Sequence, residues 1–472
     1  MNSAATSGKL PVRTKLAYGL GTVAFGIKDQ GFNALLMLYY NQVVGLPASW
    51  VGTAIMIAML VDAVCDPLIG HYSDHLQSRW GRRHPFMYAS ALPLAVAYFM
   101  LWSPPAGSHE LQFVYLLLTS IVVRVALACY EIPASALLPE FTSDYNERTS
   151  IATYRTLFMA VGSVGMAVLV FKLFLQPSAE QPVGQLNAAG YFHYSIAAAI
   201  VMLFSVLLSA RGTHSRIPTL AAHAATEHVG LGALWRGMQI LLRDRAYLSI
   251  LGCSILFAIA VGFSTSIGTY VSTYFWRLNA DHLAIIAGSL IWGLLLALVV
   301  IQLSKRFGKK QTTMTLYSIA LVAVIVPVVL GLLGLIPMDI DALLPWLIAK
   351  NILLTMCVLA ALVLATSMGA DVADHFELKS GQRMEGLMFA AFIMTNKAVS
   401  GMGVFLSGIA LTVIGFPEQA TPETVDPQIV QRLAWIYVAA MGGLCGLAIA
   451  VLGFYPITRA THEQTQRALG KR

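Results

Sequence analysis

The stretch VGTAIMIAMLVDAVCDPLIG, residues 51–70, is apolar and long enough to cross a membrane, yet it carries Asp62 and Asp66 near its end. On a helix, a spacing of four residues places both carboxylates on one face, one turn apart. Each carboxylate at the bilayer centre costs about 2.5–3.5 kcal/mol on insertion scales. Because packing does not offset that cost, we expect the two side chains to bind something.

The whole chain has the composition of a membrane protein. Of its 472 residues, 57% are hydrophobic and 11% are charged, whereas about 25% are charged in soluble proteins. We therefore predict an all-α integral membrane protein with twelve transmembrane helices in two six-helix halves: 1–210, a central loop 211–246, and 247–472. The twelve apolar segments lie at 16–42, 47–71, 85–103, 111–137, 151–174, 190–210, 247–275, 281–303, 312–335, 342–371, 385–415 and 431–456.

An internal repeat and the distribution of basic residues support this organisation. RWGRR at 79–83 follows the second segment, and RFGKK at 306–310 follows the eighth, at the matching place in its half. Most Lys and Arg residues lie in the termini, the central loop and the loops after segments 2, 4, 8 and 10. The positive-inside rule then places both termini in the cytoplasm.

Several function classes find no support in the sequence. The chain contains no P-loop for ATP and no His or Cys set with metal-site spacing, so we expect no cofactor, no metal and no enzymatic activity. The net charge of +7 is spread over short loops, which argues for membrane topology and against nucleic-acid binding.

Further charges lie inside the apolar segments. They have two readings: ion pairs that hold helices together, or a site for a solute. Two like charges one turn apart do not neutralise each other, so Asp62 and Asp66 need a cation or a shared proton. For Arg124 and Lys350 we expect the side chain to extend to the membrane interface. The other intramembrane charges are Lys28, Asp29, Glu131, Arg155 and Lys397.

A polar and aromatic stripe also runs along the first segment, at the helical spacing of Tyr18, Thr22, Phe25, Asp29 and Asn33.

Opposite charges also cluster in the predicted cytoplasmic loops. We expect them to latch the cytoplasmic side when the cavity opens outward; the alternative is an ordinary basic loop of the positive-inside kind. The residues are Asp74, Arg79, Arg82 and Arg83, facing Glu140, Asp144, Glu147 and Arg148 in the first half, with Asp371, Asp374 and Glu377 in the second.

Three motifs give the chain a resemblance to a known family. They are DAVCDPLIGHYSDHLQSRWGRRHP, EIPASALLPEFTSDYNERTSIATYR and GADVADHFELKSGQRMEG. Together they resemble the signatures of the glycoside–pentoside–hexuronide:cation symporters of the major facilitator superfamily. The resemblance implies a bacterial inner-membrane carrier with a cavity between its two halves, which takes up a sugar or glycoside together with a proton or sodium ion.

The resemblance also implies roles for individual residues. Asp62 and Asp66 match the cation-site carboxylates, and Lys397 matches a lysine that reaches toward them. Lys28, Asp29, Glu131 and Arg155 match residues that bind the sugar.

Departures from the family pattern affect the ion and the solute. Cys65 and Ala128 stand where sodium-using members have asparagine and threonine, and neither supplies the oxygen that sodium prefers, so we expect protons to couple transport. Ser135 and Leu362 replace tryptophans that hold galactosides. Two alternatives therefore stay open: a carrier of lysolipids or other amphiphiles on the same fold, and a non-transporting membrane sensor.

Overall fold

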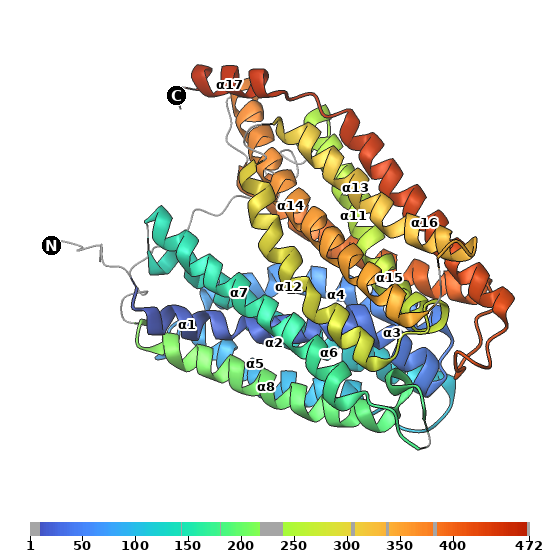
Figure 1. Ribbon diagram of the computed structural model, residues 1–472. Helices are drawn as coiled ribbons and strands as arrows, with labels where there is room; N and C mark the ends of the chain where they lie inside the picture. Colours follow the sequence, from blue (N-terminus) through green and yellow to red (C-terminus); the bar gives the residue numbers. More distant parts are fainter. Residues whose placement is uncertain are drawn as a thin grey trace. The chain divides into compact units, whose positions relative to one another are not determined.

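The structure is a computed structural model, and in the parts of the chain that it describes the regular secondary structure is helical throughout (Figure 1). It describes residues 10–142, 144–179, 181–217, 239–303, 307–336, 339–380 and 385–469. The middle of the predicted central loop, 218–238, lies outside these ranges.

The first half of the chain forms six long helical segments. The first is divided: α1 and α2 meet at Gly21, and wider turns of π-helix occupy Gly31–Leu35 and Tyr39–Val44. The helices are α1 Val12–Leu20, α2 Thr22–Gln30, α3 Leu36–Leu38, α4 Ala48–His75, α5 His84–Leu101, α6 His109–Phe141, α7 Tyr145–Leu169 and α8 Ala188–His214.

The second half repeats the pattern and ends in a short polar helix. Its helices are α11 Arg245–Tyr270, α12 Ala280–Leu303, α13 Lys309–Leu332, α14 Ile340–Ser380, α15 Glu385–Val413, α16 Pro427–Gly453 and α17 Arg459–Ala468. Among the described residues, 11 helices are long and apolar enough to span a membrane. The divided segment 12–44 supplies the twelfth predicted span, so the twelve-segment prediction agrees with the structure.

Two compact units make up the described chain. Unit 1 comprises Met1–Thr226, Asn279–Gly288 and Pro417–Thr424; unit 2 comprises Glu227–Leu278, Ser289–Phe416 and Val425–Arg472. In unit 1, α4 and α5 pack along α6, and α2 packs along α7; in unit 2, α11 packs along α15, and α13 along α14. The predicted boundaries at residues 210 and 247 stay a prediction.

Matching glycines allow close helix crossings in both units. A Cβ atom on Gly162 of α7 would lie 2.5 Å from the carbonyl oxygen of Val23 on α2. A Cβ atom on Gly262 of α11 would lie 2.5 Å from the carbonyl oxygen of Ser400 on α15. The α2–α7 and α11–α15 pairs are therefore equivalent members of the internal repeat.

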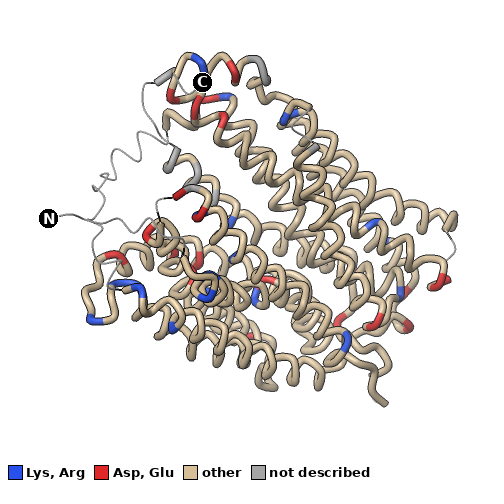
Figure 2. Tube along the Cα trace, turned by 60° about the vertical axis from the view of Figure 1, so that its left-hand side comes forward, with Lys and Arg blue, Asp and Glu red and all other residues tan. Residues whose placement is uncertain are grey.

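Charged positions are rare along these helices. In Figure 2 the tube is tan over most of its length, with only scattered blue and red positions inside the helical stretches. Each of these intramembrane charges must find a partner or a solute, because an isolated charge in a low-dielectric interior is costly.

Candidate functional site

Glu131, Arg155 and Tyr18 form a polar cluster inside unit 1. The Arg155 guanidinium of α7 pairs with the Glu131 carboxylate of α6. Arg155 Nη1 also donates to the Tyr18 hydroxyl at 3.2 Å, and that hydroxyl donates to the Ala134 carbonyl at 2.7 Å. Tyr18 is 1% exposed, whereas 23% of the Glu131 side chain remains accessible, although its Oε2 atom is buried.

Backbone contacts fix this cluster in place. The Thr22 hydroxyl donates to the Arg155 carbonyl at 2.7 Å, which ties α2 to α7 beside the ion pair. Tyr18 and Thr22 both belong to the polar stripe of the first segment. The helical period of that stripe is therefore the sequence signal that marks the face of α1 and α2 that contacts Arg155.

Lys28 and Asp29 lie further along α2. Their ion pair spans 3.7 Å from Lys28 Nζ to Asp29 Oδ1, although successive helical positions point about 100° apart. Lys28 is buried with its ammonium 4.4 Å from the ring centre of Phe25. The Asp29 side chain is 48% exposed and is the accessible member of the pair.

Asp62 and Asp66 lie one turn apart on α4, and Asp62 is buried. Arg124 of α6 faces them, with its Nη1 atom 3.5 Å from Asp62 Oδ2. The expectation that Arg124 extends to the membrane interface is therefore wrong. Arg124 is 5% exposed because the α4–α6 packing encloses its guanidinium beside an acidic partner. Sequence reasoning missed this residue as part of the site.

Lys397 lies on α15 in unit 2 and is half-buried. Beside it, the Ser254 hydroxyl of α11 donates to Asn396 Oδ1 at 2.7 Å. Ser254 lies eight residues before Gly262, and Asn396 lies seven residues before Gly403, which are the glycines of the α11–α15 crossing. In the same way, Tyr18 lies eight residues before Gly26, and Arg155 lies seven residues before Gly162, at the α2–α7 crossing. The repeat thus places a polar pair at the same level of both crossings, charged in unit 1 and neutral in unit 2.

The loop charges of unit 1 form a second cluster. Arg82 pairs with Glu140, and Arg83 bridges Glu140 at 2.9 Å and Asp74 at 3.1 Å. Arg79 does not join them; its guanidinium lies 5.9 Å from the Trp80 ring centre.

The other predicted members have local roles in helix ends. Asp144 caps α7 by accepting from the Glu147 amide at 2.7 Å, and Arg148 donates to the Thr142 carbonyl at 2.7 Å. Glu147 itself pairs with Lys15 at 2.9 Å, so it anchors α1 and does not face the basic loop.

Unit 2 contains the corresponding contacts. Lys309, at the same position of RFGKK as Arg82 in RWGRR, lies 2.7 Å from both Asp371 oxygens. The polar helix α17 also reaches this end of α14, where Gln466 donates to Asp374 at 2.6 Å. Both units therefore join the basic loop to the end of a long helix by an ion pair.

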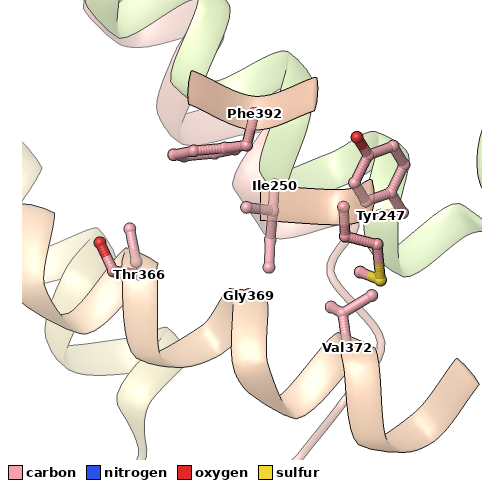
Figure 3. A pocket seen from close by; sticks show the side chains of 8 residues that line it. Tyr247, Ile250, Thr366, Gly369, Val372 and Phe392 are labelled. Atoms are coloured by element: carbon pink, nitrogen blue, oxygen red, sulfur yellow. The ribbon is translucent and has the colours of Figure 1, made fainter. Parts of the chain in front are cut away.

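Unit 2 also encloses an apolar pocket between α11, α14 and α15 (Figure 3). Its lining is mainly aliphatic and aromatic, with Tyr247 and Thr366 as the hydroxyl-bearing members. None of the predicted ion or sugar ligands lines it, so it does not resemble a site for a polyhydroxyl solute.

Comparison with known proteins gives these features a family. The model of the MFS/sugar transport protein family matches residues 17–459. The chain belongs to this family. A putative glycoside/cation symporter of Escherichia coli is 23% identical, over 98% of this chain and 96% of its own. A sodium-dependent lysophosphatidylcholine symporter of Gallus gallus is also 23% identical, over 98% of this chain and 89% of its own.

A solved structure supports the same fold. The inward-open xylose transporter XylE of E. coli matches 96% of this chain and 98% of its own with a TM-score of 0.63, at 12% identity. Membership of the MFS/sugar transport family confirms the predicted fold and the resemblance to the glycoside–pentoside–hexuronide:cation symporters. The chain is a multi-pass membrane transporter and not an enzyme.

Proposed function

We propose that this transporter carries a sugar or glycoside together with a proton, by alternating access, across a bacterial inner membrane. The observation that carries the proposal is the polar cluster of Glu131, Arg155 and Tyr18 inside unit 1, in which the Glu131 side chain stays 23% exposed. The relatives named above are symporters, which supports the coupled mode of transport.

The chemistry of the cluster suits a polyhydroxyl solute. A carboxylate accepts hydrogen bonds from sugar hydroxyls, and a guanidinium donates to them in a fixed planar geometry. We assign Glu131 and Arg155 to the sugar, with Asp29 as a further acceptor and Lys28 as its partner. The Glu131–Arg155 ion pair keeps both groups oriented, and charged, while no solute is bound.

We assign Asp62 and Asp66 to the coupling ion. Two carboxylates on one helical turn in a low-dielectric interior favour a shared proton over double ionisation. Sodium requires further oxygen ligands, which Cys65 and Ala128 do not provide. The family resemblance adds Lys397 to the same function.

We assign the loop ion pairs to the conformational cycle. In unit 1 the proposed latch residues are Asp74, Arg79, Arg82, Arg83, Glu140, Asp144 and Arg148, and in unit 2 they are Asp371 and Asp374. Such ion pairs suit a latch because they hold a basic loop against a helix end in one state; Arg83 and Glu140 are only 9% and 8% exposed, so opening the latch requires water to replace their contact.

The sugar assignment predicts the behaviour of Glu131→Gln. The variant loses the ion pair and the acceptor charge, so accumulation of a transported glycoside in membrane vesicles should fall to background, with normal amounts of folded protein in the membrane. Glu110→Gln, the same change at an exposed position of α6, should transport normally. Unaltered uptake by Glu131→Gln would place the sugar site elsewhere.

The ion assignment predicts which gradient drives uptake. Vesicles whose external medium is more acidic than their interior should accumulate the glycoside. An inward sodium gradient at clamped membrane potential should not drive this accumulation. Asp66→Asn should abolish accumulation while leaving exchange down a solute gradient measurable. Sodium-driven uptake that is indifferent to a protonophore would contradict proton coupling.

A second candidate solute is a lysolipid. The similarity to a lysophosphatidylcholine symporter favours it, as does the replacement of aromatic sugar platforms by Ser135 and Leu362. Adding lysophosphatidylcholine to the same vesicle assay distinguishes a glycoside carrier from a lysolipid carrier. Only a lysolipid carrier should transport it, or lose uptake of its own solute in its presence. A sensor without transport activity would accumulate neither solute, but it would not need buried charges in such number.

A further inference from the structure

Arg124 is held inside unit 1 by contacts from two other elements. It extends from α6, its Nη1 atom lies 3.5 Å from Asp62 Oδ2 on α4, and its guanidinium carbon lies 4.6 Å from the ring centre of Phe32 in the turn Gly31–Leu35. An arginine stacked on one side and ion-paired on the other has a fixed position. Because it is 5% exposed, it is a permanent internal charge of the bundle.

Carboxylates on two helices surround Arg124. Asp62 and Asp66 face it from α4, and Asp29 attracts it from α2, where Lys28 pairs with Asp29. Three carboxylates thus act electrostatically on one fixed guanidinium.

A fixed guanidinium beside Asp62 affects sodium and protons differently. Sodium needs several oxygen atoms converging on one point, and a neighbouring guanidinium both repels the ion and takes up Asp62 Oδ2 as a ligand. A proton binds to one carboxylate oxygen and needs no such shell. Arg124 therefore penalises sodium more than it penalises a proton.

We propose that Arg124 is the residue that determines ion selectivity at the Asp62–Asp66 pair, as a built-in counter-ion that weakens sodium binding. This proposal rests on the assignment of that pair as the coupling site. It predicts that a neutral residue at position 124 removes the charge that repels sodium and the group that engages Asp62 Oδ2, and so creates sodium affinity that the native chain lacks.

The test uses sodium alone, without any sugar. The full-length protein in detergent is melted in increasing NaCl, with choline chloride at equal ionic strength as the reference, because an ion that binds the folded state raises Tm. Arg124→Gln should bind sodium at least tenfold more tightly than the native protein, whereas Arg124→Lys, which keeps the charge, should behave as native. Arg432→Gln, the same change at an exposed position of α16, controls for loss of a positive charge.

Equal sodium responses of Arg124→Gln and the native protein would overturn the proposal, as would a response of Arg124→Lys equal to that of Arg124→Gln. If Arg124→Gln does not fold, the double variant Cys65→Asn, Ala128→Thr is melted in its place. It adds oxygen ligands but keeps Arg124, so it should stay unresponsive to sodium, and a rise in its Tm would count against Arg124. A failure of glycoside uptake in the vesicle assay bears on the proposed function alone, since the melting experiment contains no glycoside.

Discussion

At the scale of single residues, Tyr18 connects the proposed sugar ligands to the backbone of the bundle. Its hydroxyl accepts from Arg155 and donates to the Ala134 carbonyl, so one oxygen orients the guanidinium and also ties α1 to α6. Such an arrangement positions Arg155 before a solute arrives, which lowers the cost of ordering the side chain on binding.

Tyr18→Phe should therefore weaken transport affinity while leaving the fold intact. A hydrogen bond to a charged group contributes about 1.5–3 kcal/mol, so we expect the apparent KM for the transported solute to rise roughly tenfold or more. Tyr98→Phe removes a hydroxyl that hydrogen-bonds Tyr194 at 2.6 Å within the aromatic cluster of α5 and α8, and it should leave KM unchanged. Equal KM values for the two variants would show that the Tyr18 hydroxyl does not position Arg155.

Individual charges in this site were predictable, and their pairing was not. Asp62, Asp66, Glu131 and Arg155 stand out in the sequence because a charge inside an apolar segment is costly. Which charges meet depends on the rotation and depth of neighbouring helices, which one chain's hydropathy does not encode. Arg124 shows the consequence: its expected place is the membrane interface, although it lies at the midpoint of the segment 111–137, and its actual partner is Asp62 on another helix.

At the scale of helices, glycines at which two helix backbones touch determine where the residues of the site lie. Gly26 and Gly162 let α2 and α7 touch backbone to backbone, and Gly262 and Gly403 do the same for α11 and α15. Small residues permit this approach in membranes, where packing replaces the hydrophobic effect as the force between helices. Because Arg155 lies two turns before the first crossing, the distance between α2 and α7 also sets its distance from Tyr18 and Thr22.

Gly162→Ala should destabilise the protein, because the added methyl would meet the Val23 carbonyl. Overpacking of this kind costs about 1–3 kcal/mol, so we expect a Tm several degrees lower in detergent. Gly165→Ala on the same helix meets nothing within 4 Å and should leave Tm unchanged or slightly raised, since alanine favours the helix by about 1 kcal/mol. Equal losses of Tm would mean that the crossing tolerates a methyl group.

Helix positions followed from the sequence better than helix detail did. The segment predicted at 47–71 is α4 at Ala48–His75, because a long apolar run has one stable backbone in lipid. The first segment, predicted as 16–42, begins at Val12 and is interrupted at Gly21 and by wider turns near residues 31 and 39. Those interruptions depend on tertiary packing, and hydropathy carries no signal for them.

At the scale of the whole molecule, the internal repeat and the charge asymmetry describe one topology. Arg82 with Glu140 and Lys309 with Asp371 are equivalent ion pairs at equivalent loops, so the loops after α4 and α12 belong on the same side of the membrane. Both loops are basic, so we propose from the positive-inside rule that this side is cytoplasmic. With six spans in each half, the proposed orientation puts both termini on this side as well.

This topology predicts the activity of reporters fused to the chain. A reporter that works only in the cytoplasm should be active after Arg472, and alkaline phosphatase, which needs the oxidising periplasm to form its disulfides, should be inactive there. A fusion of alkaline phosphatase after Val183, in the connection between α7 and α8, should show the opposite result because an odd number of spans precedes it. The second fusion makes the test independent of expression level, since both reporters are measured at both sites. Phosphatase activity after Arg472 would reverse the orientation, and the loop ion pairs would then latch the outer face instead of the inner one.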